Sequence, residues 1–213
     1  MSTLTLLAGG TGLIGREVAA QWVGPGNLLL LVRRALPPGA PASLVVDFAA
    51  LPALPAAGAA ICCLGTTIKV AGSQQAFRAV DFDAVLSFAR AARAAGAQRF
   101  AVVSSLGASA GSSNFYSRVK GEMEDALAGV GFQILIVARP SLLIGDRRAL
   151  GQPERPGERL TQALAAPLAA LTPKAWRPIA GATVARALLR ALAQRQPGLR
   201  VLDNRDLHQL GHP

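Results

Sequence analysis

The sequence predicts an α/β fold with a doubly wound, mainly parallel sheet and helices on both faces. Short apolar runs alternate with longer segments of helical periodicity along most of the 213 residues, which is the pattern of βαβ units. The run LLLLV at 28–32 is apolar throughout, as expected for a strand that is buried on both faces. A glycine-rich turn at 9–15 separates the first strand from the first helix.

The predicted elements follow one another in a regular order. Each predicted strand is a short apolar run, and these runs lie at 4–8, 27–32, 44–46, 59–64, 99–103, 133–137 and 199–202. Helices are predicted over 13–23, 75–95 and 115–128, with two weaker ones near 158–171 and 182–195. We expect one domain over 1–213, in which 145–213 form a small C-terminal cap region.

Composition excludes several classes of protein. Hydrophobic residues make up 51% of the chain and charged residues 16%, which is typical of a globular domain rather than a disordered one. No apolar run is long enough for a membrane-spanning helix, and the start lacks the pattern of a signal peptide, so a cytoplasmic location is expected. Cys62 and Cys63 are adjacent and should point to opposite faces of a strand, as core residues. His208 and His212 have no ligand cluster around them, so no metal site is expected.

The net charge of +10 raises the question of nucleic-acid binding. The positive charge is nearly all arginine, is scattered along the chain, and does not alternate with aromatic residues, which are only 5% of the sequence. This pattern argues against nucleic-acid binding as the main role. An anionic cofactor, an acidic substrate or a surface that is merely rich in arginine accounts better for the charge.

The glycine turn has the spacing G-x-x-G-x-x-G. A tight turn and close approach to a pyrophosphate both need residues without a Cβ atom, and the helix that follows offers free N–H groups to the anion. The turn therefore predicts a Rossmann-like dinucleotide site formed by Gly9, Thr11, Gly12, Leu13, Ile14 and Gly15. The alternative is a glycine turn with a purely structural role.

The end of the second strand indicates which dinucleotide is bound. Arg33 and Arg34 stand where an enzyme that uses NAD(H) usually carries an acid for the ribose 2′-hydroxyl, and cationic groups there suit a 2′-phosphate. The sequence thus predicts NADP(H) as the preferred cofactor, with NAD(H) as the second choice. The alternative for this pair is a solvated basic surface. Asp47, at the end of the third strand, could accept a hydrogen bond from the adenine amino group.

Tyr116 and Lys120 are four residues apart in a predicted helix and share one face of it. The lysine ammonium can then favour the phenolate and lower the pKa of the tyrosine, which suits the phenol for proton transfer. Ser104 and Ser105 follow the fifth strand, at the sheet edge where ligands of α/β proteins gather. One of them could polarise a substrate oxygen. Alternatively, they are ordinary polar residues at the end of a strand.

These features together resemble the short-chain dehydrogenase/reductase superfamily, and most of all its small atypical branch typified by the Tat-interacting protein. The resemblance extends from about residue 4 to 190 and rests on the order and spacing of several blocks. Those blocks are GGTGLIG at 9–15, CCLGTT at 62–67, VDFD at 80–83, SSLGA at 104–108, Tyr116 with KGE at 120–122, and ARPSLL at 138–143.

The resemblance implies a role for each matching residue. Gly9, Gly12 and Gly15 would hold the pyrophosphate, and Arg33 the 2′-phosphate. Tyr116 and Lys120 would form the catalytic pair and also contact the cofactor, with Ser105 polarising the substrate and Ser104 beside the cofactor. Further cofactor contacts would come from Leu64, Gly65 and Thr66 on the adenosine side, and from Pro140, Ser141 and Leu142 at the nicotinamide.

Two departures from extended relatives stand out. Asp81 occupies the position where many of them carry an asparagine, which puts an asparagine-dependent proton relay in doubt. The region after residue 145 is also much smaller than the substrate portion of nucleotide-sugar enzymes.

The sequence therefore predicts an oxidoreductase that transfers hydride between NADP(H) and a small carbonyl or alcohol substrate. Two other functions remain open: an NADPH-binding regulatory or scaffold protein, and an epimerase or dehydratase with a tightly held cofactor. A homodimer or a protein partner is compatible with the small, arginine-rich C-terminal region.

Overall fold

The computed structural model describes residues 4–24, 26–145, 173 and 175–212. Its centre is a sheet in the order β3-β2-β1-β4-β5-β6-β9, in which every neighbouring pair is parallel. The strands are β1 (Thr5–Ala8), β2 (Leu28–Val32), β3 (Ser43–Val45), β4 (Ala59–Cys62), β5 (Arg99–Val103), β6 (Ile134–Ala138) and β9 (Gly198–Leu202). The predicted parallel Rossmann-like sheet is thus confirmed.

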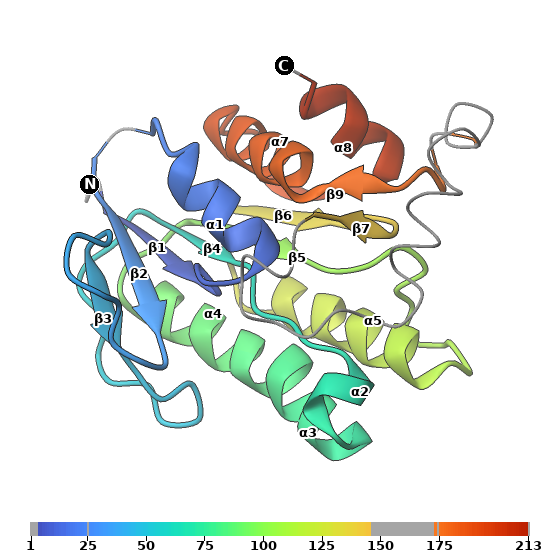
Figure 1. Cartoon of the computed structure of the whole chain (residues 1–213), viewed down its shortest axis with the longest axis horizontal. Coiled ribbons are helices and arrows are strands. Elements are labelled where there is room, and N and C mark those ends of the chain that lie inside the picture. The colour runs from blue at the N-terminus through green and yellow to red at the C-terminus, as the bar shows by residue number, and fades with distance from the viewer. Residues whose placement is uncertain (1–3, 25, 146–172, 174, 213) are drawn as a thin grey trace.

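Helices cover both faces of this sheet (Figure 1). One face carries α1 (Leu13–Ala20), α7 (Gly181–Ala193) and α8 (Asn204–Leu210), whose apolar residues form one core with the sheet. The other face carries α4 (Val85–Ala94) and α5 (Phe115–Ala128), which form a second core. Because side chains alternate along a strand, Cys62 belongs to the second core and Cys63 packs against the first. This confirms the expectation for both cysteines.

The helix predicted over 75–95 is present but is not uniform. It begins as α3 (Gln74–Arg78), passes through a π-helical segment η1 (Ala79–Ala84), and continues as α4. A separate short helix, α2 (Ile68–Ala71), precedes it; Thr67 caps α2 and Gly72, at φ 86°, ends it. The π-helical segment is absent from the sequence-based prediction, because helical periodicity alone does not show a local change in hydrogen-bond register.

The C-terminal part adds elements that the sequence did not predict. A second, two-stranded parallel sheet pairs β7 (Leu143–Ile144) with β8 (Ile179–Ala180). Asp203 is the N-cap residue of α8 and forms a capping box with Asp206. The predictions near 182–195 and 199–202 correspond to α7 and β9, and the helix predicted near 158–171 lies outside the described residues.

Candidate functional site

A pocket of about 280 Å³ opens beside the carboxyl ends of β1, β4 and β5, the edge where parallel α/β sheets bind ligands. It brings together the glycine turn, the turn after β4, the π-helical segment, and helix α5. The residues that line it are Gly12, Leu13, Ile14, Cys63, Leu64, Gly65, Thr66, Thr67, Val70, Asp81, Val103, Ser104, Tyr116, Lys120 and Leu143.

The three glycines of the turn are needed for different reasons. Gly9 has φ 78° and lies against the backbone of Cys63, and a Cβ atom on Gly15 would collide with the carbonyl of Gly9. A Cβ atom on Gly12 would meet only the Gly9 oxygen, at 3.3 Å, and Gly12 faces the pocket. The fold therefore requires glycine at 9 and 15, whereas at 12 it leaves the space open to the pocket.

This space suits a dinucleotide pyrophosphate. Gly12 is the N-cap of α1 and makes no side-chain cap, so the first N–H groups of the helix keep their capacity to bind an anion. Leu13 and Ile14 line the pocket at the same place, while Thr11 is exposed at the tip of the turn. The residues present thus fit the phosphates of a dinucleotide.

Tyr116 and Lys120 lie on the face of α5 that lines the pocket. The ring of Tyr116 packs against Phe77 of α3, with 5.2 Å between the ring centroids. The side chain of Lys120 is almost wholly buried, and its Nζ lies 2.7 Å from Oδ1 of Asp81. The predicted pair is therefore brought together, with a third, acidic residue beside it.

Burial and charge act in opposite directions on Lys120. Burial lowers the pKa of its ammonium, but the negative charge of Asp81, the nearby Tyr116 and the hydrogen bond to Asp81 raise it, and the net pKa lies above its ordinary value. Burial raises the pKa of the Cys62 thiol to about 12 and that of Cys63 still further. Both thiols therefore stay protonated at neutral pH, although Cys63 lines the pocket.

The two serines after β5 have different environments. Ser104 lines the pocket, but its hydroxyl donates to the buried carboxylate of Glu124 on α5. Glu124 is held in turn by Arg139, whose Nε lies 3.1 Å from both carboxylate oxygens. The hydroxyl of Ser105 has only a long contact, 3.4 Å, with the carbonyl of Leu106. Ser105 does not belong to the pocket lining, but its hydroxyl is held by a weaker hydrogen bond than the hydroxyl of Ser104.

Arg33, Arg34 and Asp47 lie outside the pocket lining and are exposed. The two arginines directly follow β2, which is next to β1 in the sheet. Asp47 uses one carboxylate oxygen to accept a hydrogen bond of 2.9 Å from the backbone N–H of Ala49. This local turn accounts for Asp47 without a ligand.

Pro140, Ser141 and Leu142 are fixed by contacts within the chain and do not line the pocket. The Ser141 hydroxyl donates to the carbonyl of Arg177 at 2.6 Å, and its N–H donates to the buried Asn204. Leu143, the next residue of the same block, is the one that reaches the pocket.

Sequence reasoning missed several lining residues. No site role was assigned to Cys63, Thr67, Val70, Val103 or Leu143, which also line the pocket. Cys63, Thr67 and Leu143 belong to the quoted sequence blocks, next to residues that were assigned. Gly121, directly after Lys120, is a sequence signal for the close contact between α5 and the loop before it. A Cβ atom on Gly121 would collide with the backbone of Ser109 and Ala110.

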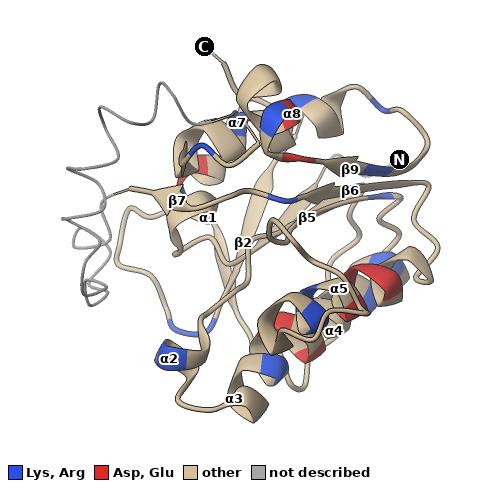
Figure 2. Cartoon of the chain, turned by 90° about the vertical axis from the view of Figure 1, so that its right-hand side faces the viewer, with Lys and Arg blue, Asp and Glu red and all other residues tan. Residues whose placement is uncertain are grey.

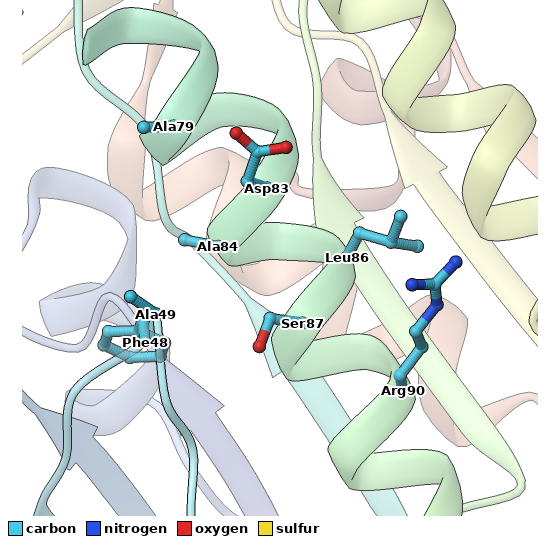
Figure 3. Close-up of a pocket in the computed structure, with 8 residues that line it drawn as sticks. All are labelled: Phe48, Ala49, Ala79, Asp83, Ala84, Leu86, Ser87 and Arg90. Atoms are coloured by element: carbon cyan, nitrogen blue, oxygen red, sulfur yellow. The ribbon is translucent and has the colours of Figure 1, made fainter.

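Charged residues also lie on other surfaces of the described chain (Figure 2). Lys and Arg residues are spread over helices on both faces of the sheet, with acids among them (Figure 2). A groove of about 570 Å³, the outer groove, lies between the loop after β3 and the helix formed by η1 and α4. Figure 3 shows Phe48 and Ala49 across from Ser87, with Asp83 and Arg90 further along the same helix. Among the described residues, no group of three or more His, Cys, Asp or Glu could hold a metal ion, and no helix could span a membrane.

Comparison with known proteins identifies curated relatives. Protein HTATIP2 of Rattus norvegicus is 38% identical over 175 residues, which cover 78% of this chain and 69% of that protein. Protein FMP52 of Lodderomyces elongisporus is 32% identical over 165 residues, 69% of each chain. Alignments to other FMP52 proteins are shorter. The alignment to FMP52-1 of Scheffersomyces stipitis covers 39% of this chain and 37% of that protein. No model of a protein family matches the chain.

Solved structures of low sequence identity share the fold. MoeE5 in complex with UDP-glucose and NAD superposes with a TM-score of 0.70 at 18% identity, covering 93% of this chain and 74% of that one. The UDP-Glc/GlcNAc 4-epimerase of Campylobacter jejuni gives 0.68 at 15% identity, covering 98% and 82%.

The expected cytoplasmic location is wrong by this comparison. The FMP52 relatives from several fungi are named mitochondrial proteins. The expectation rested on the absence of a signal peptide and of a membrane-spanning run, and neither feature bears on mitochondrial targeting.

The parallel sheet and the glycine turn between β1 and α1 agree with the fold that the sequence predicted. The aligned relatives span more than two thirds of this chain and of their own lengths. The chain belongs to the atypical short-chain dehydrogenase/reductase family that includes HTATIP2 and the FMP52 proteins.

Proposed function

We propose that this protein is an NADP(H)-dependent oxidoreductase that acts on a carbonyl or alcohol substrate. The observation that carries the proposal is the position of Lys120, a buried ammonium one helical turn from Tyr116, in the pocket where the glycine turn faces α5. A protein that only bound the dinucleotide could use the lysine for the ribose but would not need a phenol beside it.

The cofactor would occupy the side of the pocket formed by the glycine turn. Gly12 leaves room for the pyrophosphate, and the turn at Leu64 to Thr66 would lie along the adenosine side. A bound nicotinamide would supply or accept the hydride. Lys120 lines the same pocket, with Nζ 3.9 Å from where a Cβ atom on Gly65 would lie, and would donate to a ribose hydroxyl of the bound cofactor.

Tyr116 would move the proton. In the reductive direction the phenol donates its proton to the carbonyl oxygen of the substrate while the carbonyl carbon is reduced. Lys120 stabilises the phenolate that results, through its positive charge. Ser105 would donate a hydrogen bond to the same oxygen, because the hydroxyl of Ser104 is already engaged by Glu124.

The proposed preference for NADP(H) rests on Arg33 and Arg34. They follow β2 directly, are exposed, and have no acidic residue beside them in the sequence. A 2′-phosphate at the end of β2 could accept charge-assisted hydrogen bonds from either guanidinium.

An epimerase or dehydratase would use the same groups with no net change in the cofactor. The structures that share the fold include a 4-epimerase, so the assay must separate net reduction from internal redox chemistry. Incubation with NADPH and a panel of carbonyl compounds, followed at the absorbance of the reduced nicotinamide, makes that distinction.

The decisive variant is Tyr116→Phe, which removes the proton donor and keeps the ring that packs on Phe77. We expect NADPH affinity to change little and turnover to fall by about 10²–10⁴, the usual contribution of a general acid. Fluorescence titration and steady-state kinetics measure the two quantities. A Tyr116→Phe protein with full reductase activity would refute this mechanism. A regulatory protein would instead show no turnover and an NADPH-dependent partner interaction that survives the substitution.

A further inference from the structure

The π-helical segment η1 directs two acidic residues in opposite directions. Asp81 has no exposed surface, whereas Asp83, two residues later, is exposed at the outer groove shown in Figure 3. π-helical turns are rare and occur often at functional sites. The buried position of Asp81 is costly for a carboxylate unless it has partners.

Asp81 has partners on both of its oxygens. Oδ1 lies 2.7 Å from Nζ of Lys120, and Oδ2 accepts a hydrogen bond of 2.8 Å from the backbone N–H of Thr66. A Cβ atom on Gly65 would lie 3.4 Å from Oδ1. Asp81 therefore joins the π-helical segment, the turn after β4 and helix α5 at the wall of the pocket.

The charged and titratable groups around Lys120 are few. Asp81 approaches it from η1, Tyr116 lies one turn earlier on α5, and Cys62 comes from β4. The Cys62 thiol stays protonated because burial raises its pKa to about 12. Glu124, one turn later on α5, is held by Arg139. Asp81 is thus the one negative charge in direct contact with the ammonium among the described residues.

An ammonium in this position requires a counter-charge. Burial by itself lowers the pKa of Lys120, and the carboxylate of Asp81 is the main influence that raises it. A buried lysine without a partner loses its proton readily. Neutral Lys120 would neither stabilise a phenolate at Tyr116 nor attract electron-rich groups of a ligand.

We propose that Asp81 is a positioning residue that keeps Lys120 charged and directed toward Tyr116. The proposal rests on the proposed function for what Lys120 does, but not for the pairing itself. It assigns a role to the acid that stands where extended relatives carry asparagine. In this chain, the carboxylate contacts the lysine directly.

The pairing can be tested on the ligand-free protein with Asp81→Asn. In this variant the folded-state pKa of Lys120 should fall below its unfolded value of about 10.4. Between those two values the unfolded chain binds more protons than the folded one, so the stability of the variant rises with pH. The wild type lacks this rise, because its Lys120 has a raised pKa. We expect a Tm gap between the two of several degrees at pH 7 that shrinks by at least half by pH 10.

Two controls isolate the effect. Asp83→Asn makes the same change of charge on the same segment, at the exposed position in Figure 3, and its Tm gap should be small and independent of pH. Repeating the comparison in a Tyr116→Phe background removes the titration of the phenol. A gap for Asp81→Asn that stays constant from pH 7 to 10 would show that Asp81 acts only through Thr66 and packing, and would overturn the proposal.

If Asp81→Asn does not fold, the double variant Asp81→Asn/Lys120→Met decides the matter. It removes both charges, so it should fold if the carboxylate serves as the counter-charge, and a double variant that also fails to fold overturns the proposal. Where a reducible carbonyl is found, activity of Asp81→Asn should decline at a pH at least one unit lower than that of the wild type. Absence of turnover in the wild type would refute the proposed function and leave the Tm comparison intact.

Discussion

At the scale of single residues, two neighbouring serines show how the same group can serve different purposes. The hydroxyl of Ser104 donates to Glu124, which also accepts from Arg139, so its proton is already committed inside the protein. The hydroxyl of Ser105 has only its 3.4 Å contact with Leu106. A hydroxyl must have its proton free to stabilise a developing negative charge on a substrate.

Ser105→Ala should therefore lower kcat by about 10²- to 10³-fold, the usual cost of losing one such donor, with little change in stability. Ser104→Ala should lower the free energy of unfolding by about 1.5–3 kcal/mol, because it removes a hydrogen bond to a charged acceptor. Kinetics with a substrate from the carbonyl panel and urea denaturation of both variants measure these effects. Equal loss of kcat in the two variants would contradict the assignment of Ser105.

At the scale of elements, the turn between β1 and α1 separates the needs of folding from those of binding. Gly15→Ala would place a Cβ atom against the carbonyl of Gly9, so it should destabilise the protein strongly. Gly12→Ala meets only a 3.3 Å contact, so it should fold. The added methyl group would, however, occupy space that the pyrophosphate needs.

We expect Gly12→Ala to keep a circular dichroism spectrum and Tm close to those of the wild type while NADPH affinity falls at least tenfold. Gly15→Ala serves as the comparison in which Tm itself falls. Fluorescence titration gives the affinity and thermal unfolding gives the Tm. Normal NADPH binding by a folded Gly12→Ala protein would show that the turn is structural only.

Elements were predictable wherever the signal is local in sequence. The strand at 99–103 and the helix at 115–128 have the predicted bounds, and Asn114 caps that helix by accepting from the N–H of Ser117 at 3.1 Å. The glycine turn and the Tyr116–Lys120 spacing are local for the same reason. The π-helical segment was not predictable, because the pattern of apolar residues does not show a local change in hydrogen-bond register.

Contacts between elements were not predictable either, because they join residues that are far apart in the sequence. Asp81 was recognised as a departure from extended relatives, yet its ion pair with Lys120 depends on how close η1 and α5 come. The bond between Ser104 and Glu124 likewise joins β5 to α5. The contact of Ser141 with Asn204 and the pairing of β7 with β8, which begins at Leu143 in the pocket lining, also depend on residues far apart in the sequence.

At the scale of the whole molecule, the pocket joins parts that are far apart in the sequence. Its wall combines Leu13 of α1, Thr66 after β4, Tyr116 of α5 and Leu143 of β7. A ligand that binds the folded chain and not the unfolded one stabilises every one of these elements together. Thermal unfolding is therefore a direct measure of cofactor choice, even before a substrate is known.

At a free concentration 100 times its Kd, NADPH should stabilise the protein by about 2.7 kcal/mol, which corresponds to roughly 5–10 °C in Tm for a domain of this size. NADH at the same concentration should give a clearly smaller shift, because it lacks the 2′-phosphate proposed to meet Arg33. Arg33→Asp should weaken NADPH binding by about 10- to 100-fold, the scale of a charge-assisted hydrogen bond, and should leave the NADH shift nearly unchanged. Arg90→Asp makes the same change of charge at the outer groove, away from the pocket, and serves as the control. Equal shifts with NADPH and NADH in the wild type would show that the arginines after β2 do not select the cofactor.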